Sequence, residues 1–331
     1  MSDQGPCLFA LHGTDELGRA VAAALGRPLA LHEEREFEDE EHKVRPLEAV
    51  RGADVFVLHG LHGGPEQSPN DKLCRLLFFI GALKDAGAMR VTAVTPYLCY
   101  ARKDRRTKPS DPVTTRYVAS LFEALGTDAV VTLDVHNPAA FENAFRCPTV
   151  ALTAATLFVA YAKALMTGAL TNEKLCVVSP DPGGAKRADL FHEALEAALG
   201  RPVGKAFVQK RRSAGVVSGD LFVGDVDGAI ALVVDDLIST GGTLVRAARA
   251  ARQAGAKRVL ALVTHGLFMQ GAEAAVTDAA IDRVIVTDSV PAFRLGAAAR
   301  TKVEILPVAP LLAEAVRRLH AGEALTDLLV F

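Results

Sequence analysis

The sequence predicts an α/β fold in which mainly parallel sheets are flanked by helices. Short runs rich in β-branched residues alternate with helical segments along almost the whole chain. These runs are nearly continuously apolar, as expected for strands of a parallel sheet that is covered on both faces. A weak internal repeat also relates residues 84–97 to residues 252–266, each reading as a helix end, AGA, a basic residue and a strand. We therefore expect two similar α/β domains.

The elements follow in order from this alternation. Helical patterns fill residues 70–87 and 113–126, and residues 149–166 read as a strand end followed by a buried helix. The last segment, residues 311–331, predicts a helix and a short strand. The candidate strands are CLFALHG (7–13), DVFVLHG (54–60), RVTAVTPY (90–97), AVVTLDVH (129–136), LCVVSPD (175–181), AIALVVDD (229–236), RVLALVTHG (258–266) and RVIVTDS (283–289).

Composition narrows the function classes. The net charge of -2 over 331 residues argues against a nucleic-acid or membrane surface. The start of the chain lacks the basic and apolar regions of a signal peptide. The five cysteines are odd in number, widely spaced and mostly among apolar neighbours, which indicates reduced thiols and a cytoplasmic protein.

The segment VVDDLISTGGT, residues 233–243, combines two kinds of binding group. Asp235 and Asp236 end a strand, and a loop of small residues then leads into a helix. The unpaired N–H groups at a helix start favour a phosphate, whereas carboxylates suit hydroxyls or a metal ion. A sugar phosphate satisfies both halves, although an ordinary strand end with a helix cap explains the loop equally well.

Polar groups follow several other predicted strands. His136 and Asp181 end two of them, and a run of cations starts at Arg102. Ligands collect beyond the carboxyl ends of strands in α/β sheets, so these groups together suit a polyphosphate with a divalent metal. QKRR at residues 209–212 adds a second cationic cluster before a Gly-Ser-rich stretch that resembles a mobile flap.

Other motifs point away from common nucleotide and metal sites. The sequence has no GxxxxGK[ST] and no GxGxxG, so neither a P-loop nor a Rossmann fingerprint is present. His59 and His62 have a spacing that can bind metal. With no further ligand nearby, we expect them instead in a flexible, Gly-rich loop.

Several long motifs, in order, resemble the ribose-phosphate pyrophosphokinases, the phosphoribosyl pyrophosphate (PRPP) synthetases. PYLCYARKDRR is similar to the family's PYxxYARQDR, LDVHNPAAFENAF to its DLHxxQIQGFF, and SPDPGGAKRA to its SPDxGGxxRA. VVDDLISTGGT resembles the PRPP loop, and EFEDEEHKVR the FxDGE segment. The resemblance covers nearly the whole chain.

The resemblance implies two tandem phosphoribosyltransferase-type (type I) domains. Residues 1–149, joined by the C-terminal segment 310–331, would form the ATP side, and residues 150–309 the ribose 5-phosphate side. The enzyme would transfer the pyrophosphoryl group of ATP to the 1-hydroxyl of ribose 5-phosphate, giving PRPP and AMP. Mg²⁺ would be the cofactor, with Mn²⁺ as an alternative. The family also implies a homo-oligomer, built on dimers and up to a hexamer, in which the FxDGE hairpin completes the adenine site of a neighbouring subunit.

Site residues carry over by motif. The catalytic cations would be Lys210 and Arg212, and the metal ligands His136 and Asp181. The ATP-binding residues would be Phe37, Asp39, Glu41, Arg102, Lys103 and Asp104. The ribose 5-phosphate residues would be Asp235, Asp236, Ser239, Thr240, Gly241, Gly242 and Thr243.

The chain departs from the family pattern in places. Lys103 stands where Gln is usual, and Ser239 where many members have a third Asp. Glu40 replaces a Gly, which would strain a turn that needs positive φ. Residues 59–69 look like a small insertion. These differences leave phosphate activation and ADP inhibition open.

Other functions remain compatible with some of these motifs. A type I phosphoribosyltransferase that consumes PRPP shares the DDLISTGGT loop, but commonly lacks the YARKDRR segment and a matching first half. A non-catalytic homologue of the synthetase would be expected to disrupt the QKRR flap. Divergence to another sugar phosphate or nucleotide donor is the third alternative.

Overall fold

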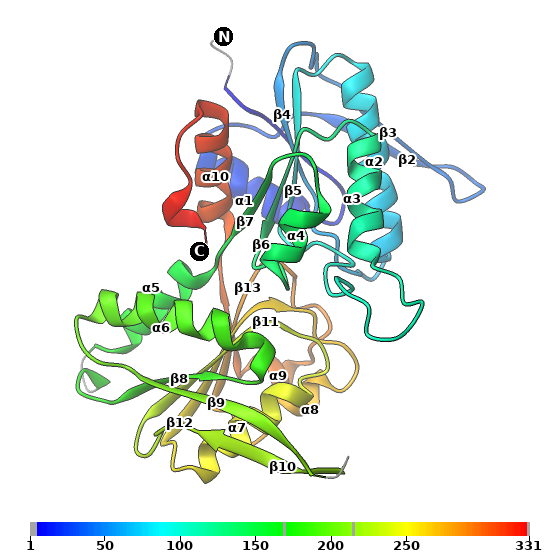
Figure 1. Cartoon of the computed structure of the whole chain (residues 1–331). Coiled ribbons are helices and arrows are strands. Elements are labelled where there is room, and N and C mark those ends of the chain that lie inside the picture. Colours follow the sequence, from blue (N-terminus) through cyan, green and yellow to red (C-terminus); the bar gives the residue numbers. More distant parts are fainter. Residues whose placement is uncertain (1–4, 168–169, 214–215, 330–331) are drawn as a thin grey trace. The chain divides into compact units, whose positions relative to one another are not determined.

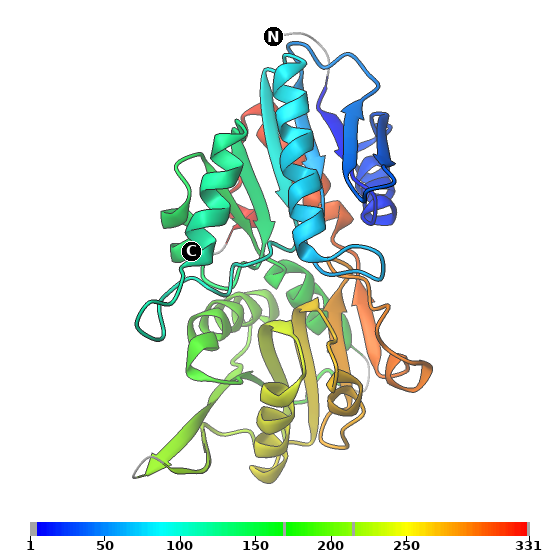
Figure 2. The same cartoon turned by 90° about the vertical axis from the view of Figure 1, so that its right-hand side faces the viewer.

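The structure, a computed structural model, describes residues 5–167, 170–213 and 216–329, with the side chains of residues 210–220 left out. The chain divides into two compact units (Figures 1 and 2). Unit 1 is Met1–Thr153 with Val308–Val330, and unit 2 is essentially Ala154–Pro307. Both are α/β units with predominantly parallel sheets, so the predicted fold class is confirmed.

Unit 1 contains a five-stranded sheet in the order β1-β4-β5-β6-β7, and each neighbouring pair is parallel. Helices α1 and α10 cover one face, and α2 and α3 cover the other (Figures 1 and 2). The strands are β1 (Cys7–Ala10), β4 (Asp54–Leu58), β5 (Arg90–Thr95), β6 (Ala129–Leu133) and β7 (Thr149–Leu152). The helices are α1 (Asp15–Leu25), α2 (Pro69–Asp85), α3 (Thr114–Ala124), α4 (Pro138–Ala144) and α10 (Ala309–Ala321), followed by the 3₁₀ turn η3 (Thr326–Leu328).

Local sequence explains where the longest helix begins. Ser68 accepts a hydrogen bond from the N–H of Asp71, whose carboxylate accepts one from the N–H of Ser68. This reciprocal capping box satisfies N–H groups that have no partner inside the helix. Pro69 occupies the first helical position, where its missing N–H costs nothing. Helix α2 is therefore fixed in register directly after the segment at residues 59–68.

A separate two-stranded hairpin lies in the connection between α1 and β4. It pairs β2 (His32–Glu36) with β3 (His42–Pro46), and Glu36 faces His42 at the end of the ladder. In its turn Glu40 has φ of 68°, so the expected positive-φ position is real and carries a residue with a Cβ. The hairpin extends past α2 in Figure 1.

Unit 2 contains a seven-stranded sheet in the order β10-β9-β8-β11-β12-β13-β14, antiparallel only between β9 and β10. Helices α5 and α6 pack together, and α7 packs against β10, β11 and β12. The strands are β8 (Leu175–Ser179), β9 (Gly204–Ser213), β10 (Val216–Val223), β11 (Ile230–Ile238), β12 (Arg258–Gly266), β13 (Arg283–Thr287) and β14 (Val303–Leu306). The helices are α5 (Ala155–Leu165), α6 (Ala185–Leu199), α7 (Gly242–Gln253), α8 (Ala272–Val276) and α9 (Ala297–Arg300), with the 3₁₀ turn η2 (Pro182–Gly184) before α6.

The apolar strands form the cores, as their sequences predict. All residues of β4 and β8 are buried, and so are the first residues of β11. All five cysteines are free, and Cys99 and Cys176 are buried whereas Cys74 is exposed. Within the described ranges, no helix combines the length and the hydropathy needed to cross a membrane.

Candidate active site

Strand β11 places two acidic side chains at its carboxyl end in unit 2. The side chain of Asp235 is 22% exposed and that of Asp236 only 6%. The backbone N–H of Asp236 donates to Oδ1 of Asp235 at 2.9 Å, which holds the first carboxylate against the strand end. The two acids are therefore fixed next to each other at the edge where α/β sheets bind ligands.

This proximity is electrostatically unfavourable when no cation is bound. Burial, the charge of Asp236 and a hydrogen bond with Asp236 together raise the pKa of Asp235 well above its ordinary value. Arg187 acts in the opposite direction. The pair is thus prepared to receive hydroxyl donors or a cation, since either would stabilise the charged form.

Arg187 is a site residue that sequence reasoning missed. Its guanidinium lies 3.6 Å from Oδ1 of Asp235 and 3.7 Å from Oδ1 of Asp236. It belongs to the first turns of α6, at the end of the SPDPGGAKR motif. Arg187 belongs to a motif that the sequence analysis identified. Its contact with residues 235–236 was not predictable, because the two segments are far apart in sequence.

The loop after β11 has a backbone that requires glycine. Gly241 has φ of 82°, and a Cβ there would lie 2.3 Å from the Cβ of Ala275. A backbone hydrogen bond anchors the loop, because the carbonyl of Ser239 accepts from the N–H of Met269. Helix α7 begins at Gly242, so its first N–H groups face the loop formed by Ser239–Thr243. This arrangement suits an anion.

Asp181 follows β8 and caps the turn that leads into α6. Its Oδ1 accepts hydrogen bonds from the N–H groups of Gly183 at 2.8 Å and Gly184 at 3.1 Å. The same carboxylate was predicted as a metal ligand. The observed bonds give it at least a structural role as a helix cap.

Lys210 and Arg212, the predicted catalytic cations, lie on β9. The backbone of Lys210 pairs with Asp220 and that of Arg212 with Val217 in the β9–β10 ladder. Their side chains lie outside the described part of the structure.

The cationic loop after β5 lies in unit 1. Arg102 is exposed, whereas Lys103 donates to Oδ2 of Asp111 at 2.8 Å. That bond and others from Thr107 hold the pKa of Asp111 far below its ordinary value. Asp104 accepts a hydrogen bond from the side-chain amide of Asn137 at 2.6 Å. Lys103 and Asp104 therefore help to shape the loop.

The Asp104–Asn137 bond joins the loops that follow two adjacent strands, β5 and β6. His136 stands directly before Asn137 and is exposed. Both loops hold non-glycine residues in positive φ, Tyr100 at 61° and Asp134 at 38°. Backbone strain of this kind concentrates at functional sites.

The predicted metal ligands do not form a ready-made cage. His136 belongs to unit 1 and Asp181 to unit 2. Among the described residues, no cluster of three or more His, Cys, Asp or Glu side chains is placed to hold a metal ion.

The hairpin turn carries the remaining predicted ATP residues. The N–H of Phe37 donates to the carbonyl of Glu41, and the N–H of Glu41 donates to Oδ1 of Asp39. The Phe37 ring is 37% exposed, and the guanidinium of Arg35 lies 5.1 Å from its centroid. An exposed aromatic ring beside carboxylates is suited to stack on a base.

His59 and His62 lie in the Gly-rich loop between β4 and α2, as expected, but they are buried, at 0% and 4% exposure, and not held loosely at the surface. Nδ1 of His59 lies 3.0 Å from Oγ1 of Thr14, and the N–H of Gly60 donates to the same hydroxyl. The Gly-rich segment is thereby packed into unit 1.

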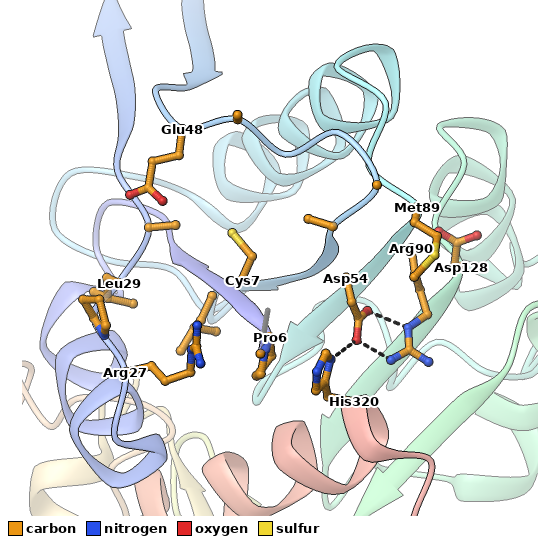
Figure 3. Close-up of a pocket in the computed structure, with 17 residues that line it drawn as sticks. Pro6, Cys7, Arg27, Leu29, Glu48, Asp54, Met89, Arg90, Asp128 and His320 are labelled. Atoms are coloured by element: carbon orange, nitrogen blue, oxygen red, sulfur yellow. Dashed lines mark hydrogen bonds and ion pairs between the residues drawn. The ribbon is translucent and has the colours of Figure 1, made fainter. Parts of the chain in front are cut away.

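Unit 1 also has a cavity of about 600 Å³ at the amino ends of its strands, where β1, β4 and β5 begin (Figure 3). Asp54, Arg90 and His320 lie on one of its walls and are joined by ion pairs. Arg90 also donates to the carbonyl of Leu319, so the group fastens α10 to the sheet. Substrate sites of α/β sheets lie at the other edge, which makes a structural role the direct interpretation of these contacts.

Comparison with known proteins identifies relatives over the whole chain. The N-terminal domain of ribose phosphate pyrophosphokinase matches residues 6–126, and the phosphoribosyl synthetase-associated domain matches residues 217–330. The ribose-phosphate pyrophosphokinase of Caldanaerobacter subterraneus subsp. tengcongensis is 37% identical over 322 residues, 97% of this chain and 96% of the relative. That of Maricaulis maris is 38% identical over 314 residues, 95% of this chain and 96% of the relative.

A solved structure shares the fold over the same extent. The crystal structure of phosphoribosylpyrophosphate synthetase from Mycobacterium smegmatis superposes with a TM-score of 0.84 at 32% identity. The match covers 96% of this chain and 100% of that one.

Proposed function

As a member of the ribose-phosphate pyrophosphokinase family, the chain is an enzyme that makes PRPP from ATP and ribose 5-phosphate, and we propose that its two units divide these substrates between them. Unit 2 binds ribose 5-phosphate, and unit 1, with the C-terminal helix, binds ATP. The relatives match both units, which disfavours a phosphoribosyltransferase built on one of them.

The observation that carries the assignment of unit 2 is the pairing of an acid pair with an anion loop on β11 and α7. The 5-phosphate binds the N–H groups and hydroxyls of Ser239–Thr243, and the ribose hydroxyls donate to Asp235 and Asp236. Each end of the ligand meets complementary groups, since the anionic phosphate meets hydrogen-bond donors and the neutral hydroxyls meet carboxylate acceptors. Arg187 keeps the two carboxylates in place before the sugar arrives.

In the reaction, the 1-hydroxyl oxygen of the sugar attacks the β-phosphorus of ATP. A new O–P bond forms as the hydroxyl releases its proton to solvent, the bond from that phosphorus to the bridging oxygen of the α-phosphate breaks, and AMP leaves with that oxygen. Negative charge grows on the transferred group, so the chain must supply cations and exact placement more than covalent chemistry. We assign this charge-neutralising role to Lys210 and Arg212 on β9, with Arg102 on the ATP side.

A divalent cation fits the donors of unit 2. Two adjacent carboxylates offer hard oxygen ligands, and the pKa of Asp235 is raised by burial and by the charge of Asp236, both of which a bound cation would offset. Asp235 and Asp236 would hold Mg²⁺ or Mn²⁺, with Asp181 and His136 as the further predicted ligands. Bound there, the metal would neutralise charge on the phosphates. Mg²⁺ usually binds through one or two carboxylates and substrate oxygens, so a cage of protein ligands is not required.

On the ATP side, the exposed Arg102 contacts the nucleotide, while Lys103 and Asp104 maintain the loop that presents it. The turn of the hairpin, with Phe37, Asp39 and Glu41, completes the adenine site of a neighbouring subunit. We accordingly propose a homo-oligomer built on dimers. Five free thiols favour a reducing compartment such as the cytoplasm.

Replacement of Lys210 by Ala tests the assignment of the catalytic cation. We expect turnover to fall by about 100-fold or more, because a charge that stabilises the transition state is lost. AMP release from ATP and ribose 5-phosphate, without any base present, measures it, and light scattering checks the oligomer. Lys205→Ala is the matched control on the same strand, since Lys205 forms an exposed pair with Asp189. Near-normal turnover of Lys210→Ala would remove this residue from the mechanism.

A further inference from the structure

The β2–β3 hairpin meets the rest of unit 1 through Val44, which is buried in the core, and through a group of charged and polar side chains. In β2 the alternation of a strand places His32, Glu34 and Glu36 on one face and Glu33 and Arg35 on the other. An isolated two-stranded hairpin is marginally stable in water, so its direction depends on what it is tied to.

Glu34 is the centre of these ties. Its side chain is 12% exposed. Oε1 accepts hydrogen bonds from the backbone N–H of His12 at 2.7 Å and lies 3.0 Å from Nε2 of His32. Oε2 lies 3.5 Å from Nε2 of His42 on the partner strand. One carboxylate therefore bridges both strands of the hairpin and the turn between β1 and α1.

A second tie runs to helix α2. Arg75 approaches Glu36 at 2.6 Å, and the Arg75 side chain is 11% exposed. The capping box fixes the register of α2, so the Arg75–Glu36 ion pair connects the end of β2 to a rigid helix.

Directed hydrogen bonds hold Glu34 ionised. Burial alone would raise the pKa of Glu34, but the hydrogen bonds from His32 and from the backbone N–H of His12 lower it to about 2. Lys72, which is 2% exposed and donates to the carbonyl of Gly60 at 3.3 Å, lies near His59 in the same region. A buried carboxylate with this many directed contacts specifies a geometry.

We propose that Glu34 is a positioning residue for nucleotide binding, which fixes the direction of the hairpin and thereby the place of residues 37–41 at its tip. The inference rests on the proposed role of that tip in the adenine site. Glu34 lies in the middle pair of the ladder, and Glu36 lies in its last pair, directly before the turn that carries the ligand groups. A change of angle at these anchors therefore displaces the turn.

Hydrogen exchange of the whole protein tests the anchor without reference to activity. Glu34→Gln keeps the shape and one acceptor but removes the charge. We expect amides of residues 33–45 to exchange at least tenfold faster in this variant, while the strands of the sheet stay protected. Glu33→Gln is the control, because Glu33 is on the opposite face and pairs with the exposed Arg45. Unchanged exchange in Glu34→Gln would overturn the proposal. Should that variant fail to fold, Arg75→Gln removes the second tie and is measured in the same way.

Steady-state kinetics then separate positioning from general damage. We expect Glu34→Gln to raise KM for ATP about tenfold, with kcat and KM for ribose 5-phosphate changed less than twofold. Glu33→Gln should leave all three unchanged. A faster-exchanging hairpin together with an unaltered KM for ATP would contradict the positioning role.

The premise has its own test in Phe37→Ala. If this variant binds ATP normally, the tip is not part of the nucleotide site, and the proposed function of the hairpin fails. Faster exchange in Glu34→Gln would still show the anchor in that case, so the two failures are distinguishable.

Discussion

Asp236 shows how a residue can serve binding at a cost to stability. Its carboxylate is nearly buried beside that of Asp235, and the pair repels itself when no cation or hydroxyl is bound. We predict that Asp236→Asn lowers kcat/KM for ribose 5-phosphate by about 10- to 100-fold, because a charge-assisted hydrogen bond is lost. The melting temperature should stay equal or rise.

Kinetics with varied ribose 5-phosphate and calorimetry measure the two effects. Glu193→Gln on α6, an exposed position, is the control for loss of one negative charge. A large fall in melting temperature with normal kcat/KM would contradict this account of Asp236.

Gly241 is required by the backbone of the phosphate loop. We predict that Gly241→Ala destabilises unit 2 by about 2–4 kcal/mol, since it combines a left-handed conformation with a collision against Ala275. Urea unfolding checks the value. Gly242→Ala is the matched control for stability, because a Cβ there meets nothing within 4 Å and the position starts a helix. Equal destabilisation by both substitutions would refute the argument.

For single residues, the sequence predicts those that lie in recognisable motifs. It does not reveal residues that act through contacts between motifs. Asp235 and Gly241 follow from the end of one strand and the loop after it. Arg187 does not, because its partners come from another strand of the sheet. Glu34 was equally hidden, since HEERE reads as a solvated charged stretch until the hairpin brings His42 against it.

The hairpin is an element whose anchoring should respond to pH. The pKa of His42 is lowered by burial and by the charge of Arg75, against the opposing effect of Glu34. A histidine with a depressed folded pKa contributes stability that is complete above the unfolded value of 6.5 and is lost as pH falls below it. The pKa of Glu34 is lowered from 4.5 to about 2, so a second contribution to stability is lost as the pH falls from 4.5 to about 2.

We therefore predict that acidification from pH 7.5 to 5.5 destabilises the protein more than it destabilises His42→Gln. The comparison isolates His42, because His12 has a raised pKa from its bond to Glu66 and contributes with the opposite sign in both proteins. Calorimetric melting temperatures at the two pH values measure the difference. A pH dependence that is the same in both proteins would rule out the contribution of His42.

Elements are predictable where burial imposes an apolar pattern. DVFVL and LCVVS are buried along their whole length, so their strands were recognised from composition alone. β2, β3 and β14 were not predicted, because HEERE, HKVRP and VEIL carry charges that a half-exposed ladder tolerates. β9 and β10 were not predicted either, since their sequences read as a cationic cluster followed by a mobile flap. In such strands, backbone pairing decides the structure and leaves little trace in the side chains.

At the scale of the whole molecule, alternation of strands and helices with an internal repeat was enough for the fold class. The burial of His59 and His62 shows the limit of such reasoning. Glycines around them indicate a loop, yet hydrogen bonding to Thr14 folds the segment into unit 1. A local pattern describes the backbone that a segment prefers, and not whether another part of the chain will cover it.

The most direct measurement of the central claim is phosphorus NMR of the purified protein with ATP, Mg²⁺ and ribose 5-phosphate. The account predicts that the ATP signals are replaced by those of AMP and of a new diphosphate ester attached to the sugar. Formation of ADP with a sugar monophosphate ester would contradict it, because a single phosphoryl group would then have been transferred.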